Sequence, residues 1–189
     1  MHNYLPKIFY FINDFNQDHI RKLDKKIAII YRNYKKKNIY NDVLKIKVFC
    51  KKNQRKFYLS NNFNLAIKLK LDGFYIPSFN KKMINKDNLK TNFLLLGSAH
   101  SVNQIKLKEK QGVDIIFLSP LFITKDKKNI LGINKFNLLA NQTKKKIVAL
   151  GGINENNIKK LNLTNCYGFA SISLIQNSYS KIRSIIKKY

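Results

Sequence analysis

The sequence is organised around eight short, continuously apolar runs that are separated by longer, lysine-rich segments. The runs cover residues 7–12, 26–31, 56–60, 73–77, 93–98, 114–119, 146–152 and 168–173. Each run is rich in Ile, Phe, Tyr or Val and lacks the polar–apolar alternation of a half-exposed strand. Such runs are typical of strands buried on both faces, and therefore of a parallel sheet.

The segments between the runs carry apolar residues three or four positions apart, as amphipathic helices do. The clearest pairs are Val43 with Ile46, Phe136 with Leu139, Ile158 with Leu161, and Ile182 with Ile186. Eight strand–helix alternations predict a compact (βα)8 TIM barrel, a single domain over residues 1–189. An open doubly wound sheet of fewer strands is the alternative, because a short apolar run can be misread as a strand.

The net charge of +27, from 37 Lys+Arg against 10 Asp+Glu, would suit a nucleic acid or an anionic membrane as partner. However, arginine makes the bidentate phosphate contacts of such surfaces, and the chain has only Arg21, Arg32, Arg55 and Arg183. The lysine excess comes with abundant Asn, Ile, Phe and Tyr, which share A/T-rich codons. We therefore attribute the charge to genome composition and expect no nucleic-acid partner; salt-sensitive, non-specific binding through the lysines is the alternative.

Other features point to a globular cytoplasmic protein. Hydrophobic residues make up 44% of the chain, which is enough for a packed core. No apolar run approaches the ~18 residues of a membrane span, and the N-terminus lacks the pattern of a signal peptide. Cys50 and Cys166 have no metal-binding or redox spacing and suit a reducing compartment.

The ends of the predicted strands carry the candidate functional residues, because barrel chemistry lies on the loops that follow the strands. Gly151 and Gly152 follow the seventh strand, where glycines let backbone N–H groups approach an anion at a helix N-terminus. Ser173 ends the eighth strand and adds a hydroxyl on the same side. Together they predict a phosphate site; an ordinary glycine-rich turn is the alternative.

The long loop after the sixth strand and the exit of the fifth strand add further candidates. Thr124 can donate a hydrogen bond to a pyrophosphate oxygen, and Lys127 can neutralise its charge, unless Lys127 is one more solvated lysine. His100 is a possible base or a hydrogen-bonded structural residue.

Motifs at successive strand ends, taken in order, are similar to those of one family. The N-terminal half has FYFIND (9–14), YRNY (31–34), LSNN (59–62), GFYIPSFN (73–80) and LGSAH (96–100). The C-terminal half has GVDII (112–116), SPLFIT (119–124), ALGGI (149–153) and GFASIS (168–173). Over about residues 8–176 the chain resembles thiamine phosphate synthase and its sister, the thiazole tautomerase (TenI).

The resemblance implies an enzyme of thiamine biosynthesis. It would couple an aminopyrimidine diphosphate to a thiazole phosphate, release pyrophosphate and use Mg²⁺. By the same resemblance, the residues that hold the diphosphate are Arg32, Asn61, Ser98, Thr124 and Lys127. The residues that hold the thiazole phosphate are Gly151, Gly152, Ile172 and Ser173.

The chain departs from the family pattern at the positions of the metal. The two aspartates that bind Mg²⁺ in the family fall on Asn62 and Asn80, whose amide oxygens can ligate the ion without neutralising it. Tyr34 replaces the lysine of the second motif, and Pro120 stands where the tautomerases have their catalytic histidine. Two alternatives to the synthase stay open, namely a non-catalytic barrel that binds phosphate or thiazole phosphate, and a tautomerase, for which His100 is the only strand-end histidine.

Overall fold

A computed structural model describes residues 5–85, 89, 91–124 and 129–186. The eight strands are β1 (Ile8–Ile12), β2 (Ile27–Tyr31), β3 (Phe57–Ser60), β4 (Gly73–Ile76), β5 (Leu94–Ala99), β6 (Ile115–Leu118), β7 (Lys146–Leu150) and β8 (Gly168–Ser171). The helices are α1 (Gln17–Lys22), α2 (Tyr40–Lys52), α3 (Phe63–Lys68), α4 (Val102–Lys110), α5 (Gly132–Ala140), the 3₁₀ helix η1 (Ile158–Leu163) and α6 (Ser173–Ile186).

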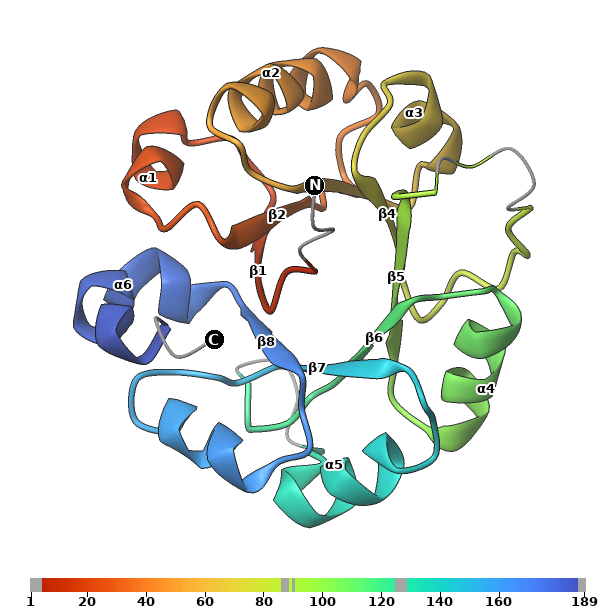
Figure 1. Ribbon diagram of the computed structural model, residues 1–189, viewed down its shortest axis with the longest axis vertical. Helices are drawn as coiled ribbons and strands as arrows, with labels where there is room; N and C mark the ends of the chain where they lie inside the picture. Colours follow the sequence, from red (N-terminus) through yellow and green to blue (C-terminus); the bar gives the residue numbers. More distant parts are fainter. Residues whose placement is uncertain (1–4, 86–88, 90, 125–128, 187–189) are drawn as a thin grey trace.

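The strands form a closed, parallel barrel in sequence order, with the helices arranged around it (Figure 1). Pairing of β8 with β1 closes the ring, and places Phe169 opposite Ile8. The predicted TIM barrel is confirmed, and the alternative of an open sheet is wrong. Seven of the eight predicted apolar runs contain one strand of the barrel each, and the run 93–98 covers β5 except for its last residue, Ala99.

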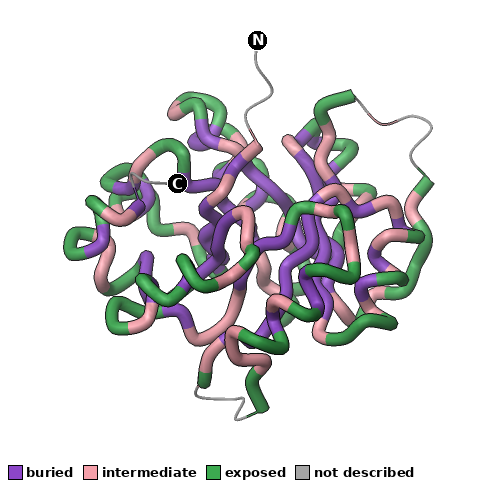
Figure 2. Tube along the Cα trace, turned by 60° about the horizontal axis from the view of Figure 1, so that its bottom comes forward, coloured by how far each residue is buried: buried purple, intermediate pink, exposed green. Residues whose placement is uncertain are grey.

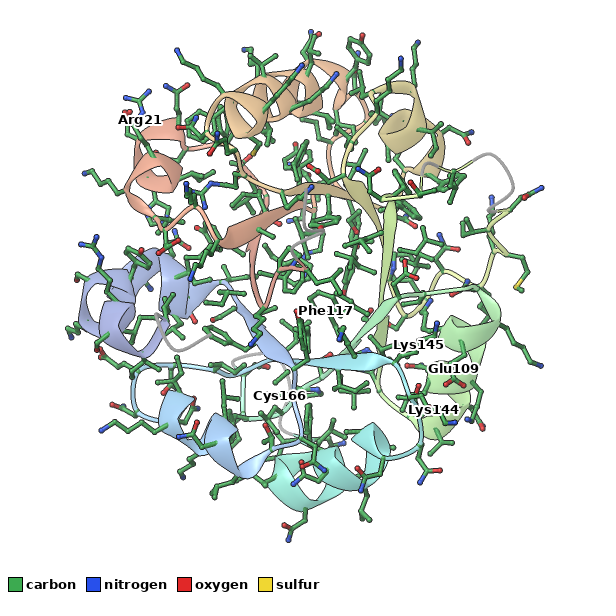
Figure 3. The ribbon with its side chains drawn as sticks, in the orientation of Figure 1. Arg21, Glu109, Phe117, Lys144, Lys145 and Cys166 are labelled. Atoms are coloured by element: carbon green, nitrogen blue, oxygen red, sulfur yellow. The ribbon has the colours of Figure 1, made fainter. Side chains whose placement is uncertain are left out.

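Two apolar layers explain why the strands are apolar on both faces. Most of the buried residues lie along the strands at the centre of the molecule (Figure 2). One layer fills the space between the strands and the helices, and the other fills the barrel itself. The inner layer is built on aromatic rings, with Phe117 near the centre (Figure 3). Ring centroids lie 4.9 Å apart for Phe9 and Phe117, and 5.3 Å apart for Tyr75 and Phe117.

The outer elements differ from the expected helices at three places. Ile158 and Leu161 are buried as predicted, but they belong to a 3₁₀ helix. The described residues between β4 and β5 contain no helix. Ser173 is the first residue of α6, whereas the last strand ends at Ser171. Among the described residues, no helix combines the length and apolarity needed to cross a membrane.

Candidate active site

The parallel barrel gathers the candidate residues at its carboxyl end, where all eight strands exit. Six of them line one cavity of about 600 Å³, which lies between the exits of β2, β6, β7 and β8. We call it the glycine cavity; the predicted residues that line it are Arg32, Thr124, Gly151, Gly152, Ile172 and Ser173. The structure therefore brings the four predicted thiazole-phosphate residues together with two of the five predicted diphosphate residues, Arg32 and Thr124.

The two glycines of this cavity are required by the path of the backbone. Their φ angles are +95° at Gly151 and +69° at Gly152, in a region that side chains rarely adopt. A Cβ at Gly152 would stand 2.4 Å from the carbonyl oxygens of Phe122 and Ile123, because the loop after β6 lies across the glycines. That loop is fixed here by a 3.0 Å hydrogen bond from the N–H of Phe122 to the oxygen of Gly151.

A helix N-terminus does face this cavity, but it follows β8 and not β7 as predicted. Residues 154–157 form turns before η1, so no helix dipole points at the glycines from that side. Helix α6 begins at Ser173, directly after the last strand. Within the described chain, neither the N–H groups of Gly152 and Ser173 nor the Ser173 hydroxyl has a hydrogen-bond partner. These donors can bind a phosphate.

Arg32 brings a fixed positive charge to the same cavity. Its N–H donates to the oxygen of Ile12 at 2.8 Å, and its guanidinium lies 5.1 Å from the ring centroid of Phe11. Since Phe11 belongs to the packed barrel interior, this cation–π contact holds the charge over the barrel mouth. Arg32 also borders a neighbouring cavity that Asn33, Tyr34 and Lys36 line.

Ser98 lies below the mouth, in β5, and is only 6% exposed. Burial raises the pKa of the neighbouring Tyr75 phenol, and a hydrogen bond between Tyr75 and Ser98 partly offsets the shift. Tyr75 was missed in the sequence because it lies inside an apolar strand. Its alternation with Phe74 and Ile76, which pack outward, is the signal that could have placed it inside the barrel.

A second group of candidates lines a separate cavity of about 580 Å³ at the exits of β3 and β4. It contains Asn61, Asn62 and Asn80, together with Lys81 and Lys82, and we call it the asparagine cavity. The side-chain nitrogen of Asn80 donates to the side-chain oxygen of Asn61 at 2.8 Å. The described residues that line the cavity include no carboxylate.

These asparagines do not fit Mg²⁺. The Asn62 oxygen accepts a hydrogen bond from the N–H of Leu65 at 3.2 Å, and the Asn80 oxygen accepts one from the N–H of Lys82 at 3.0 Å. Mg²⁺ needs oxygen ligands, which are most often carboxylates. Over the described ranges, no three His, Cys, Asp or Glu side chains are grouped so as to hold a metal.

The buried Lys108 of α4 fixes the loop that carries Asn80. Its ammonium donates to the carbonyl oxygens of Pro77 and Asn80, at 2.9 and 3.0 Å, and to the side-chain oxygen of Gln111 at 2.8 Å. Burial lowers the pKa of Lys108 from 10.5 to about 8. Gly97 leaves room for the lysine stem, because a Cβ there would lie 2.9 Å from the Lys108 Cδ. The sequence reasoning missed this lysine among its many solvated neighbours.

Tyr34 connects the two sides of the mouth. Its hydroxyl lies 2.8 Å from the Ser60 hydroxyl, at the end of β3. Its ring meets the Phe79 ring edge-on, with the centroids 5.7 Å apart. Burial of the hydroxyl raises the pKa of Tyr34. A neutral aromatic side chain therefore bridges the exits of β3 and β4.

His100 has the hydrogen bonds of a structural residue. Its Nδ1 lies 2.6 Å from the carbonyl oxygen of Ser119, and its Nε2 lies 3.1 Å from the Ser78 hydroxyl. Because a carbonyl only accepts, Nδ1 carries a proton, and the ring joins the loops after β4 and β6. Neither the glycine nor the asparagine cavity is lined by His100. Lys127, the remaining candidate, lies outside the described residues.

Comparisons with known proteins identify the family of this chain. The sequence model described as thiamine monophosphate synthase matches residues 20–175. A thiamine-phosphate synthase of Fusobacterium nucleatum is 24% identical over 87% of this chain and 83% of its own length. One of Methanococcus vannielii is 27% identical over 70% and 68%. The structure of a thiamine phosphate pyrophosphorylase from Pyrococcus furiosus superposes with a TM-score of 0.77, at 17% identity, over 96% of both chains. The match over residues 20–175 shows that this chain belongs to the thiamine monophosphate synthase family.

Proposed function

We propose that the protein is a thiamine phosphate synthase, which joins an aminopyrimidine diphosphate to a thiazole phosphate and releases pyrophosphate. The observation that carries this proposal is the glycine cavity, where the Arg32 guanidinium shares one space with the donors of Gly152 and Ser173. The relatives named above carry the same activity in their names.

The thiazole phosphate is assigned to the glycine side of this cavity. The N–H groups of Gly152 and Ser173 and the Ser173 hydroxyl donate to its oxygens, and the dipole of α6 favours its charge. Ile172, which is 37% exposed, supplies an apolar wall beside the phosphate. Gly151 holds the loop after β6 in place.

The reaction needs charge stabilisation more than proton transfer. The C–O bond between the pyrimidine methylene and the diphosphate breaks, and its electron pair leaves with the diphosphate. The lone pair of the thiazole nitrogen then forms the new C–N bond. Arg32, held on the Phe11 ring, stabilises the leaving group, so the reaction can proceed although His100 is engaged in structural hydrogen bonds.

The remaining diphosphate contacts are assigned to residues around Arg32. Thr124 lines the same cavity, Asn61 lies across the mouth and Ser98 lies beneath it. Lys127 is assigned from the family motif alone. We further infer that Asn62 and Asn80 replace the metal-binding aspartates of the family, so Mg²⁺ is not held at these two positions.

The test is product formation by the purified full-length chain with both substrates. We expect thiamine phosphate, and we expect Arg32→Ala to lower kcat/KM by about 100-fold, since a charge-assisted contact to the leaving group is lost. Arg21→Ala is the matched control, because Arg21 lies on the outer face of α1 (Figure 3) and should leave the rate unchanged. No product above the Arg32→Ala background would refute the proposal.

A second candidate function is a non-catalytic barrel that binds thiazole phosphate. Asn62 and Asn80 favour it, because they remove the charge that a catalytic metal would need. Calorimetry would then detect binding of thiazole phosphate without any turnover. The tautomerase alternative has less support, since Pro120 stands at its histidine position and His100 is hydrogen-bonded through both nitrogens.

The remaining assignments concern location and partners. We place the protein in the cytoplasm, with small phosphorylated molecules as its ligands and no nucleic acid or membrane as partner. Cys50 and Cys166 support this location, because neither forms a disulfide.

A further inference from the structure

The hydrogen bonds of the asparagine cavity fix which end of each amide faces it. A backbone N–H can only donate, so the atom of Asn62 that meets Leu65 is the oxygen. The same argument, with the N–H of Lys82, fixes the oxygen of Asn80. The other end of Asn80 is then its NH₂ group, which obliges Asn61 to accept with its own oxygen.

Two backbone donors therefore set three amide orientations. The oxygen of each of the three asparagines accepts a hydrogen bond, and the NH₂ groups of Asn61 and Asn62 have no acceptor in the described part of the chain. The cavity presents side-chain N–H donors where a cation site would present oxygens. Such an arrangement binds anions.

The charges near the asparagine cavity also favour an anion over a cation. Lys81 and Lys82 line it, and the buried ammonium of Lys108 lies 3.0 Å from the carbonyl oxygen of Asn80. A positive charge that close disfavours a divalent cation and favours phosphate oxygens. Gln111 donates to the same carbonyl at 3.0 Å, so the Asn80 backbone is held in place without a ligand.

We propose that the asparagine cavity is a direct anion site, which binds a diphosphate group through Asn61, Asn62 and the neighbouring lysines without Mg²⁺. The proposal rests on the function proposed above only in naming the diphosphate as the ligand. The Tyr34–Phe79 contact places this site next to the cavity that Arg32 borders.

Calorimetry with inorganic pyrophosphate as the probe tests the site without requiring turnover. The wild-type chain should bind pyrophosphate in EDTA, and added Mg²⁺ should not tighten binding by more than about twofold. Asn62→Asp is the decisive variant, because aspartate caps α3 as well as asparagine does and keeps the bond to Leu65. It replaces only the NH₂ group, by a carboxylate oxygen.

We expect Asn62→Asp to weaken pyrophosphate binding in EDTA at least tenfold, and Asn61→Asp to do the same. Added Mg²⁺ should restore affinity in both variants. Asn103→Asp adds the same charge at an exposed position of α4 and should change affinity less than twofold. These variants retain the shape of asparagine, and an unchanged thermal midpoint would verify their folding.

Three results would overturn the proposal. The first is wild-type binding that requires Mg²⁺, and the second is wild-type affinity in both aspartate variants in EDTA. Absence of pyrophosphate binding under either condition would overturn it as well. Failure of the synthase proposal has a different signature. In that case no thiamine phosphate forms, while metal-independent binding and its loss in Asn62→Asp remain.

Discussion

The glycine and asparagine cavities lie at the same end of the barrel, but they are built in different ways. In the glycine cavity, backbone geometry sets the donors, through the positive φ angles of Gly151 and Gly152 and the start of α6. In the asparagine cavity, side chains supply the donors, and hydrogen bonds to the backbone orient them. The glycine cavity therefore depends on the backbone conformation, and the asparagine cavity depends on which side chains line it.

This difference determines how freely the residues of each cavity can be substituted. An asparagine and an aspartate have the same shape, so the charge of the second cavity can be altered without moving the backbone. No residue other than glycine fits at position 152, because the loop after β6 fills the space beside it. A bias toward asparagine codons can therefore change the residues of the asparagine cavity, while the glycines of the glycine cavity stay unchanged.

The largest expected effect is that of a substitution at Gly152, which changes the glycine cavity alone. Gly152→Ala should destabilise the fold by roughly 3 kcal/mol or more and abolish phosphate binding, since its Cβ meets two carbonyl oxygens at 2.4 Å. Gly132→Ala is the matched control. Gly132 has a similar φ of +64°, but nothing within 4 Å of its Cβ, so only the backbone strain of about 1 kcal/mol is expected. Denaturant unfolding measures both, and equal losses would contradict the steric argument.

The second prediction concerns the lysine beneath the asparagine cavity. The pKa of Lys108 is lowered from 10.5 in the unfolded chain to about 8 in the fold, so its charge destabilises the fold below pH 8. This cost disappears as the pH rises from 8 to 10.5, where the unfolded state binds the extra proton. Relative to Lys108→Met, the wild-type free energy of unfolding should therefore increase by roughly 3 kcal/mol over this range.

Urea unfolding of both proteins at several pH values measures the difference. The comparison cancels the titration of the other lysines and tyrosines that the two chains share. Parallel curves for the two proteins would show that burial does not lower the pKa of Lys108, and would contradict this prediction.

The barrel could be predicted from the sequence because its strands are short runs that are apolar on both faces. The same pattern does not predict whether each covering helix is an α-helix or a 3₁₀ helix. Ile158 and Leu161 are three positions apart, a spacing that fits the three-residue turn of a 3₁₀ helix as well as an α-helix. Their burial was therefore predicted correctly, and their conformation was not.

The candidate site could be predicted only in part from the sequence. Strand ends identify which residues reach the mouth, but not which of them share a cavity, because that depends on how the loops fold. Lys108 shows the limit most clearly. It is buried because Gly97, on the adjacent strand, leaves space for it, and because Pro77 and Asn80 offer carbonyl oxygens. None of these partners is within four residues of it in the chain.

The smallest expected effect concerns the Ser173 hydroxyl of the glycine cavity. Ser173→Ala keeps the N–H of α6 and removes an exposed hydroxyl that has no partner among the described residues. Stability should stay within about 0.5 kcal/mol, and the affinity for inorganic phosphate should fall only about threefold to tenfold, because water can take the place of this exposed hydroxyl. Ser180→Ala, at an exposed position of α6 beyond its kink at Ser178, should not change the affinity. Calorimetry with inorganic phosphate measures both affinities. If Ser173→Ala lowered the affinity as much as Gly152→Ala does, the glycine cavity would depend on a side chain, as the asparagine cavity does. The contrast between a cavity built from the backbone and one built from side chains would then fail.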